Sequence, residues 1–109
     1  MVITNTTVSE PIESQSQTLE YNHPLFLQST DVSGVSIISF QLKGSENYTR
    51  WNKSMKLALL GRNKLGFVNS KCKKENYPKN LWDQWERVNA IVLSWLMNSI
   101  DVSVIGGIV

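Results

Sequence analysis

The sequence contains few of the residues that build disulfides, metal sites and membrane spans. Its 109 residues include one cysteine, Cys72, and one histidine, His23. One cysteine excludes an intramolecular disulfide. One cysteine and one histidine are also too few for a structural zinc site, which takes four ligands. No apolar run approaches the ~20 residues that cross a bilayer, and the N-terminus lacks the basic and apolar regions of a signal peptide. These absences predict an intracellular protein that does not bind membranes.

Catalytic motifs are also absent from the sequence. There is no glycine-rich phosphate-binding loop of either common type. The segment from Asp31 to Gly34 differs from the aspartic-protease motif by an inserted valine, and we interpret it as a turn. Cys72 has no histidine near it in sequence to act as a base, so we interpret it as a structural loop cysteine. The sequence therefore predicts a protein that is not an enzyme and takes no cofactor, metal or small-molecule substrate.

Charge is distributed unevenly along the chain. The net charge of +2 combines −4 in residues 1–34, +8 in residues 35–80 and −2 in residues 81–109. A basic middle segment suits an anionic partner such as RNA, although a solvated surface is its commoner cause. The candidate nucleic-acid contacts are Lys64, Lys71, Lys73, Lys74 and Lys79.

The composition divides the chain into a tail and one domain. Residues 1–20 are rich in Ser, Thr, Gln and Glu and contain no aromatic residue, which predicts a disordered tail. Residues 21–109 are predicted to form a mainly α-helical bundle. It begins with an extended or irregular segment, in which Ile38, Phe40 and Leu42 alternate with polar residues as in a half-buried strand. The only evident partner for that strand is the stretch 25–27.

Apolar residues with helical spacing predict a first helix over residues 47–62. At 100° per residue they fall on a stripe about 100° wide, as expected for a helix that packs on a core. The members of the stripe are Tyr48, Trp51, Met55, Ala58 and Leu59. Ser45 or Asn47 is expected to cap its N-terminus. A connector with apolar residues 65–68 and a polar loop over residues 69–80 are expected to follow.

A second and more strongly apolar helix is predicted over residues 81–99. Asn80 is its expected N-cap, and Asp83 complements the positive N-terminal end. Its core stripe consists of Leu81, Trp85, Val88, Val92, Trp95 and Leu96. Trp82 lies beside that stripe. We expect Trp51 and Trp85 to be buried against each other's helices.

The C-terminal part is more apolar than two helices and a strand can cover. Ile91, Leu93 and Met97 add apolar surface outside the stripe, and residues 102–109 carry no charge. We therefore expect a domain truncated at its C-terminus, with Asp101 as the cap of a further helix whose body is absent. Exposed apolar surface of this kind predicts self-association through residues 88–109, most commonly as a two-fold dimer that persists at high salt.

An ordered set of motifs in residues 22–109 resembles a known family. They are Pro24-Leu-Phe-Leu27, Asp31-x-x-Gly34, Leu42-x-Gly44, Asn47-Tyr-x-x-Trp51 with Met55, Asn63-Lys-Leu-Gly-Phe-Val68, Trp85-x-x-x-Asn89 and Val92-x-x-Trp95-Leu96-x-Asn-Ser99-Ile100. The set resembles the N-terminal region of the Gag polyprotein of plant copia-type LTR retrotransposons. Family chains usually continue into further helices and a zinc knuckle, which this sequence lacks. It also has Asn69-Ser70 where the family often has an acidic residue and glycine.

The resemblance implies a helical, capsid-like structural module in the cytoplasm. Proteins of this family self-associate into particles around the RNA of the retrotransposon. The family motif residues Asn47, Tyr48, Trp51, Met55, Trp85, Val92, Trp95 and Leu96 are then expected to belong to the core and not to a site. Two other hypotheses remain open from the residues alone: a small nucleic-acid-binding module that uses the basic segment, and a protein-interaction adaptor recruited by the host.

Overall fold

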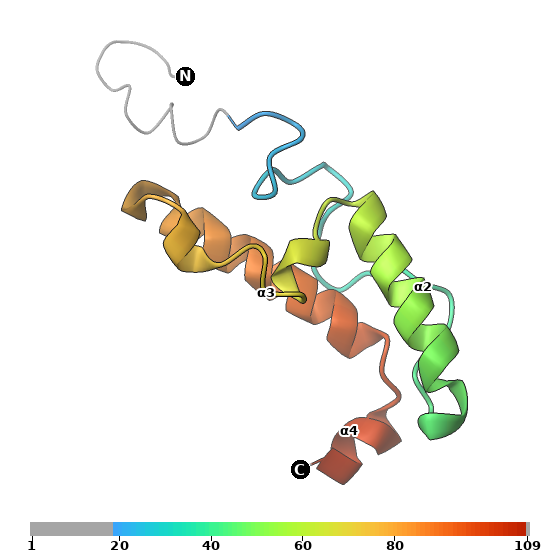
Figure 1. Ribbon diagram of the computed structural model, residues 1–109. Coiled ribbons are helices and arrows are strands. Elements are labelled where there is room, and N and C mark those ends of the chain that lie inside the picture. Colours follow the sequence, from blue (N-terminus) through green and yellow to red (C-terminus); the bar gives the residue numbers. More distant parts are fainter. Residues whose placement is uncertain (1–18, 109) are drawn as a thin grey trace, which may run out of the picture.

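The structure is a computed structural model, which describes the backbone of residues 19–108 and the side chains of residues 19–105. Figure 1 shows two long helices, α2 (Tyr48–Gly61) and α3 (Trp82–Asn98), and a short third helix, α4 (Val102–Ile108). Single 3-10 turns, η2 to η5, lie at Ser45–Asn47, Leu65–Phe67, Lys74–Asn76 and Lys79–Leu81. The predicted mainly helical fold is confirmed. The tail predicted to be disordered covers residues 1–20, and only residues 19 and 20 of it are among the described residues.

Helix α2 occupies the predicted range to within one residue at each end, but its N-terminus is not capped as expected. A 3-10 turn leads into it, and neither Ser45 nor Asn47 makes a capping hydrogen bond with its side chain. Asn47 Oδ1 accepts a hydrogen bond from the Lys43 N–H (2.9 Å), and Asn47 Nδ2 donates to the Gln41 carbonyl (2.9 Å). Asn47 therefore fixes the chain that enters the helix.

Helix α3 also lies where it was predicted, and its N-cap prediction is wrong as well. Asn80 belongs to the 3-10 turn Lys79–Leu81, and the cap residue Leu81 has no side-chain acceptor. Asp83 lies in the first helical turn, where its carboxylate complements the free backbone N–H groups.

The core forms where the inner stripes of α2 and α3 meet the N-terminal segment. Its buried apolar residues are Leu25, Trp51, Met55, Leu59, Cys72, Val88, Val92 and Trp95. Leu96 and Trp85 are partly buried against them. Tyr48 was expected in the core, but it is 49% exposed.

The two tryptophans expected to pack on each other's helices have different neighbours. Trp51 is buried, and its indole Nε1 donates to the Ser99 carbonyl just after α3 (2.8 Å), so this half of the prediction is close to the structure. Trp85 packs on Phe67 of the connector, with 5.6 Å between ring centroids, and its Nε1 donates to the Cys72 carbonyl (3.1 Å). The connector, and not α2, covers Trp85.

The predicted strand over residues 38–42 is not formed, and residues 19–108 contain no strand. Leu42 makes one isolated parallel bridge with Ile100. In it the Leu42 N–H donates to the Ser99 carbonyl (2.8 Å), and the Asp101 N–H donates to the Leu42 carbonyl (2.9 Å). The alternating apolar side chains do pack on the core, but the segment bends and has no adjacent strand to pair with.

Asp101 starts a further helix, as the sequence predicted, and the helix body that was expected to be absent is present as α4. Asp101 Oδ1 accepts hydrogen bonds from the Ser103 N–H (2.9 Å) and the Ser103 hydroxyl (2.8 Å). The ion pair of Oδ2 with Lys43 Nζ (2.8 Å) and these hydrogen bonds hold the pKa of the Asp101 carboxyl below its usual range. The junction between α3 and α4 is therefore fixed to the chain before α2.

We predict that Trp51→Phe lowers the free energy of unfolding by about 0.5–1.5 kcal/mol, since it removes one of the two hydrogen bonds that the buried Ser99 carbonyl accepts, and the bond from the Leu42 N–H remains. Tyr48→Phe is the control: Tyr48 is exposed, so its loss of a hydroxyl should change stability by less than about 0.5 kcal/mol. Urea unfolding followed by circular dichroism measures both. Equal stability of the two variants would contradict the role given to this hydrogen bond.

Candidate functional site

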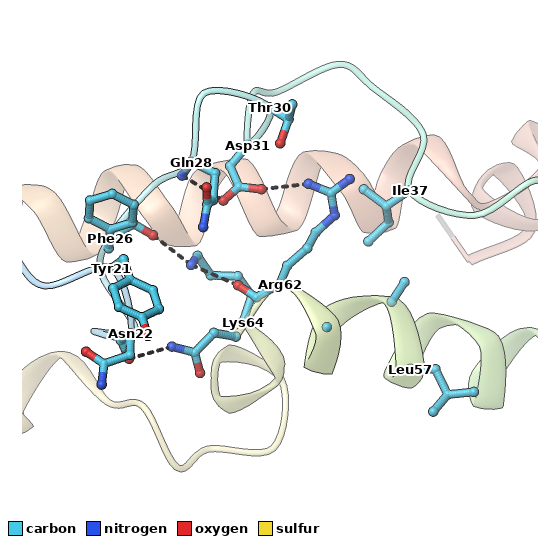
Figure 2. Close-up of a pocket in the computed structure, with 13 residues that line it drawn as sticks. Tyr21, Asn22, Phe26, Gln28, Thr30, Asp31, Ile37, Leu57, Arg62 and Lys64 are labelled. Atoms are coloured by element: carbon cyan, nitrogen blue, oxygen red, sulfur yellow. Dashed lines mark hydrogen bonds and ion pairs between the residues drawn. The ribbon is translucent and has the colours of Figure 1, made fainter.

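A buried ion pair ties the N-terminal segment to the end of α2. Asp31 is buried, and its Oδ1 contacts the Arg62 guanidinium at 2.6 Å. Asp31 Oδ2 accepts a hydrogen bond from the Gln28 N–H (3.0 Å), which closes the turn that precedes it. Figure 2 shows Arg62 extending from the end of α2 towards Asp31. The turn predicted at Asp31 is therefore an attachment point for the helix.

Lys64 is a second charged group beneath the same segment. Its side chain is buried, with the residue 2% exposed, and its Nζ donates to the carbonyls of Phe26 (2.8 Å) and Arg62 (3.2 Å). Burial is the main cause that lowers the pKa of the Lys64 ammonium, and nearby Asp31 opposes it. Lys64 had been a candidate nucleic-acid contact, but in the structure its ammonium hydrogen-bonds backbone carbonyls inside the protein and does not reach the surface.

These groups lie at a hollow between the N-terminal segment and α2 (Figure 2). Tyr21, Phe26, Ile37 and Leu57 contribute its apolar surface. The charged groups of the hollow are already matched to one another or to carbonyls, so an anion would gain little from them. We interpret the hollow as the outer surface of the contact that holds the N-terminal segment to the end of α2.

Arg62 also connects this attachment to α3. Its guanidinium lies over the Trp95 ring, 5.0 Å from the centroid. Trp95 is fully buried, and its Nε1 donates to the Val32 carbonyl (2.8 Å) next to Asp31. This arrangement was not predicted from the sequence. The sequence did contain one indication of it: Asp31 is the only charged residue between Glu20 and Lys43.

The other candidate nucleic-acid contacts lie in the loop that precedes α3. Lys71, Lys73 and Lys79 are exposed. Lys74 forms an ion pair with Glu86, and its Nζ lies 4.9 Å from the centroid of the Trp82 ring. Lys79 Nζ lies 5.7 Å from the same ring. Two of the four lysines of the loop thus lie beside one partly exposed tryptophan, and one of these two, Lys74, already has an acidic partner.

Cys72 and His23 have structural surroundings. Cys72 is buried, and its Sγ lies 3.2 Å from the Tyr77 hydroxyl. Burial, and then the hydrogen bond with Cys72, raises the pKa of Tyr77 to about 12. His23 Nδ1 accepts a hydrogen bond from the Leu25 N–H (3.0 Å), and burial followed by the charge of Lys64 lowers the pKa of the imidazole. Among the described residues, no three His, Cys, Asp or Glu side chains are grouped so as to hold a metal ion.

Apolar side chains are exposed on the outer sides of all three helices. On α2 they are Leu57 and Leu60, and on α3 they are Leu93 and Met97, each more than half exposed. Val102 in the first turn of α4 is 80% exposed. No helix in the described part of the chain is long and apolar enough to cross a membrane. The exposed leucines of α2 were not singled out from the sequence, although both lie opposite its core stripe in the helical projection.

We predict that Asp31→Ala lowers the free energy of unfolding by about 2–3 kcal/mol. A fully buried pair typically costs about 3–5 kcal/mol when one partner is removed, but Arg62 keeps some contact with water. Glu86→Ala, which breaks the exposed pair with Lys74, should cost less than about 1 kcal/mol. Thermal or urea unfolding of the two variants measures the difference. Similar costs for both pairs would refute the structural importance of Asp31.

Comparison with known proteins bears on the segment that contains this attachment. Residues 28–74 match the family model described as Gag-polypeptide of LTR copia-type. The comparisons with curated proteins and with solved structures gave no match. The matched residues include Asp31, all of α2, Arg62 and Lys64, while α3 and α4 follow them. The resemblance inferred from the sequence motifs is confirmed over this range: residues 28–74 are similar to the copia-type Gag-polypeptide family.

Proposed function

We propose that this protein is a structural assembly module of a copia-type Gag polypeptide, which works by self-association and without catalysis. The observation that carries the proposal is the exposed apolar surface of α3 and α4. Leu93 and Met97 are one helical turn apart on α3, and Val102 in the first turn of α4 is also exposed. Contact between copies would remove this surface from water.

The small size of the folded core supports the same interpretation. Seven of the eight buried apolar residues come from the inner sides of α2 and α3 and from the N-terminal segment, and Cys72 comes from the loop between the helices. The outer side of α3 takes no part in that core. Retaining leucine and methionine there lowers solubility without stabilising the monomer, so a contact between chains is their most direct physical explanation.

We predict that the protein associates at micromolar concentration and that Leu93→Glu/Met97→Glu abolishes the association. Burying two new carboxylates at an apolar contact is strongly unfavourable. Sedimentation velocity at low and high salt measures the association, which should persist at high salt because it is mainly apolar. Lys71→Ala/Lys73→Ala is the control and should associate as the parent does. A strictly monomeric parent protein would refute the proposal.

A second candidate function, RNA binding, is favoured by the loop before α3. Lys71, Lys73 and Lys79 are exposed there, and two lysines lie beside the partly exposed ring of Trp82. Lysines beside an aromatic ring match the requirements of single-stranded RNA, whose phosphates pair with lysine and whose bases stack on aromatic faces.

We predict that Lys71→Gln/Lys73→Gln/Lys79→Gln weakens the binding of a single-stranded RNA oligonucleotide and reduces the dependence of affinity on salt. Each lysine that contacts a phosphate contributes roughly one unit to the slope of log K against log salt, so up to about two to three units are at stake. Lys56→Gln on α2, outside the loop, is the control and should leave the affinity and the slope nearly unchanged. Fluorescence anisotropy at several salt concentrations measures both. No binding by the parent protein at low salt would dismiss this function.

A further inference from the structure

The outer sides of α2 and α3 carry the same spacing of exposed residues with opposite charge. On α2 the residues at positions i, i+3, i+7 and i+10 are Arg50, Lys53, Leu57 and Leu60. On α3 the same four positions are Asp83, Glu86, Ala90 and Leu93. All eight residues are exposed, and Met97 continues the α3 series by one more step. We call these the α2 face and the α3 face.

This spacing is the one at which two helices pack along a common seam. Residues three and four apart lie one above another on a helix, and alternation of such steps keeps a single line of side chains facing a neighbouring helix. Each face lies opposite the core stripe of its own helix, whose buried members are Trp51, Met55 and Leu59 on α2, and Val88, Val92 and Trp95 on α3. The two faces of one molecule therefore point away from their shared core and cannot meet each other within it.

We infer that the α2 face of one copy packs in parallel on the α3 face of a second copy. This inference rests on the proposed self-association and names the surface that the α3 face meets. In this register the cations Arg50 and Lys53 lie opposite Asp83 and Glu86. One turn further along, Leu57 and Leu60 lie opposite Ala90 and Leu93. Both the charges and the apolar side chains are then complementary.

Charge disfavours the pairing of two α2 faces. Helix α2 contains Arg50, Lys53 and Lys56 and no acidic residue. Two such faces in parallel would bring like charges together, which is unfavourable at an interface. Local partners do not remove the charges of either face. The Arg50 guanidinium lies over the Phe40 ring, 4.1 Å from the centroid, but keeps its charge, and the Glu86 side chain is 60% exposed although Lys74 pairs with it.

Because the contact joins two different faces, it is a heterologous contact. Every copy that binds through its α3 face still offers its own α2 face to the next copy. Such contacts repeat until they close into a ring, or continue as an open chain. A two-fold dimer, the arrangement expected from the sequence, would instead use one face twice.

Two variants distinguish these arrangements. Leu57→Glu/Leu60→Glu removes the α2 face, and Leu93→Glu/Met97→Glu removes the α3 face; all four residues are exposed, so both variants should fold, as circular dichroism checks. We expect each variant alone to sediment as a monomer. An equimolar mixture should form a 1:1 dimer, because it restores one intact α2 face and one intact α3 face. Val68→Glu, an exposed apolar position outside both faces, is the control and should associate as the parent does.

Association by Leu57→Glu/Leu60→Glu alone would overturn the inference and leave the proposed self-association through α3 intact. A mixture that stays monomeric would also overturn it. Failure of the parent protein to associate would refute both this inference and the proposed function. The two outcomes above would refute the inference alone, so the two cases are distinguishable.

Charge reversal tests the register independently. Lys53→Glu and Glu86→Lys should each weaken association by about tenfold, since each places like charges opposite one another. Mixing the two variants restores two matched contacts between unlike chains, the native contact of Lys53 with Glu86 and the contact between the two introduced charges. The chain that carries both changes should associate nearly as the parent does. Absence of this rescue, with both variants folded, would overturn the parallel register.

Discussion

Residues 22–41 form neither helix nor strand, and six of their backbone carbonyls accept hydrogen bonds from side chains of the helices and of the turns next to them. Lys64 Nζ binds the Phe26 carbonyl, Gln84 Nε2 binds that of Leu25, and Trp95 Nε1 binds that of Val32. Further donors are Asn63, Asn98 and Asn47, which bind the carbonyls of Asn22, Val35 and Gln41. Carbonyls next to a core must be paired, and here side chains replace the missing neighbouring strand. The packing of this segment on the helices depends on this set of bonds.

This constraint explains which features the sequence could predict. The ranges of α2 and α3 follow from apolar spacing, which depends only on residues close together in the chain. The strand prediction over residues 38–42 failed because alternation reports which side chains face the core, and not whether a neighbouring strand exists. The burial of Lys64 was not foreseeable from a basic, polar context. It depends on the position of the Phe26 carbonyl, which is set by contacts nearly forty residues away in sequence.

The segment that is similar to the Gag-polypeptide family model does not contain its own complete core. Trp51, within the segment, donates to the Ser99 carbonyl, and Arg62 lies over Trp95; both partners belong to α3 or its end. The Leu42 bridge to Ile100 adds a third connection of the same kind. The segment at residues 28–74 and the helix that follows it therefore form one physical unit, so residues outside the match are under the same packing requirements as those inside it.

The same division into an inner and an outer side accounts for the unusual composition of both long helices. Their inner stripes are filled with tryptophan, methionine, valine and leucine, and this suffices to bury the core. The outer leucines of α2 and α3 then add nothing to the monomer, yet each follows two charged residues of one sign at a fixed spacing. An isolated exposed leucine requires no explanation, but matched positions on two helices with opposite charges do. Packing between copies accounts for the spacing, the exposure and the sign of the charges together.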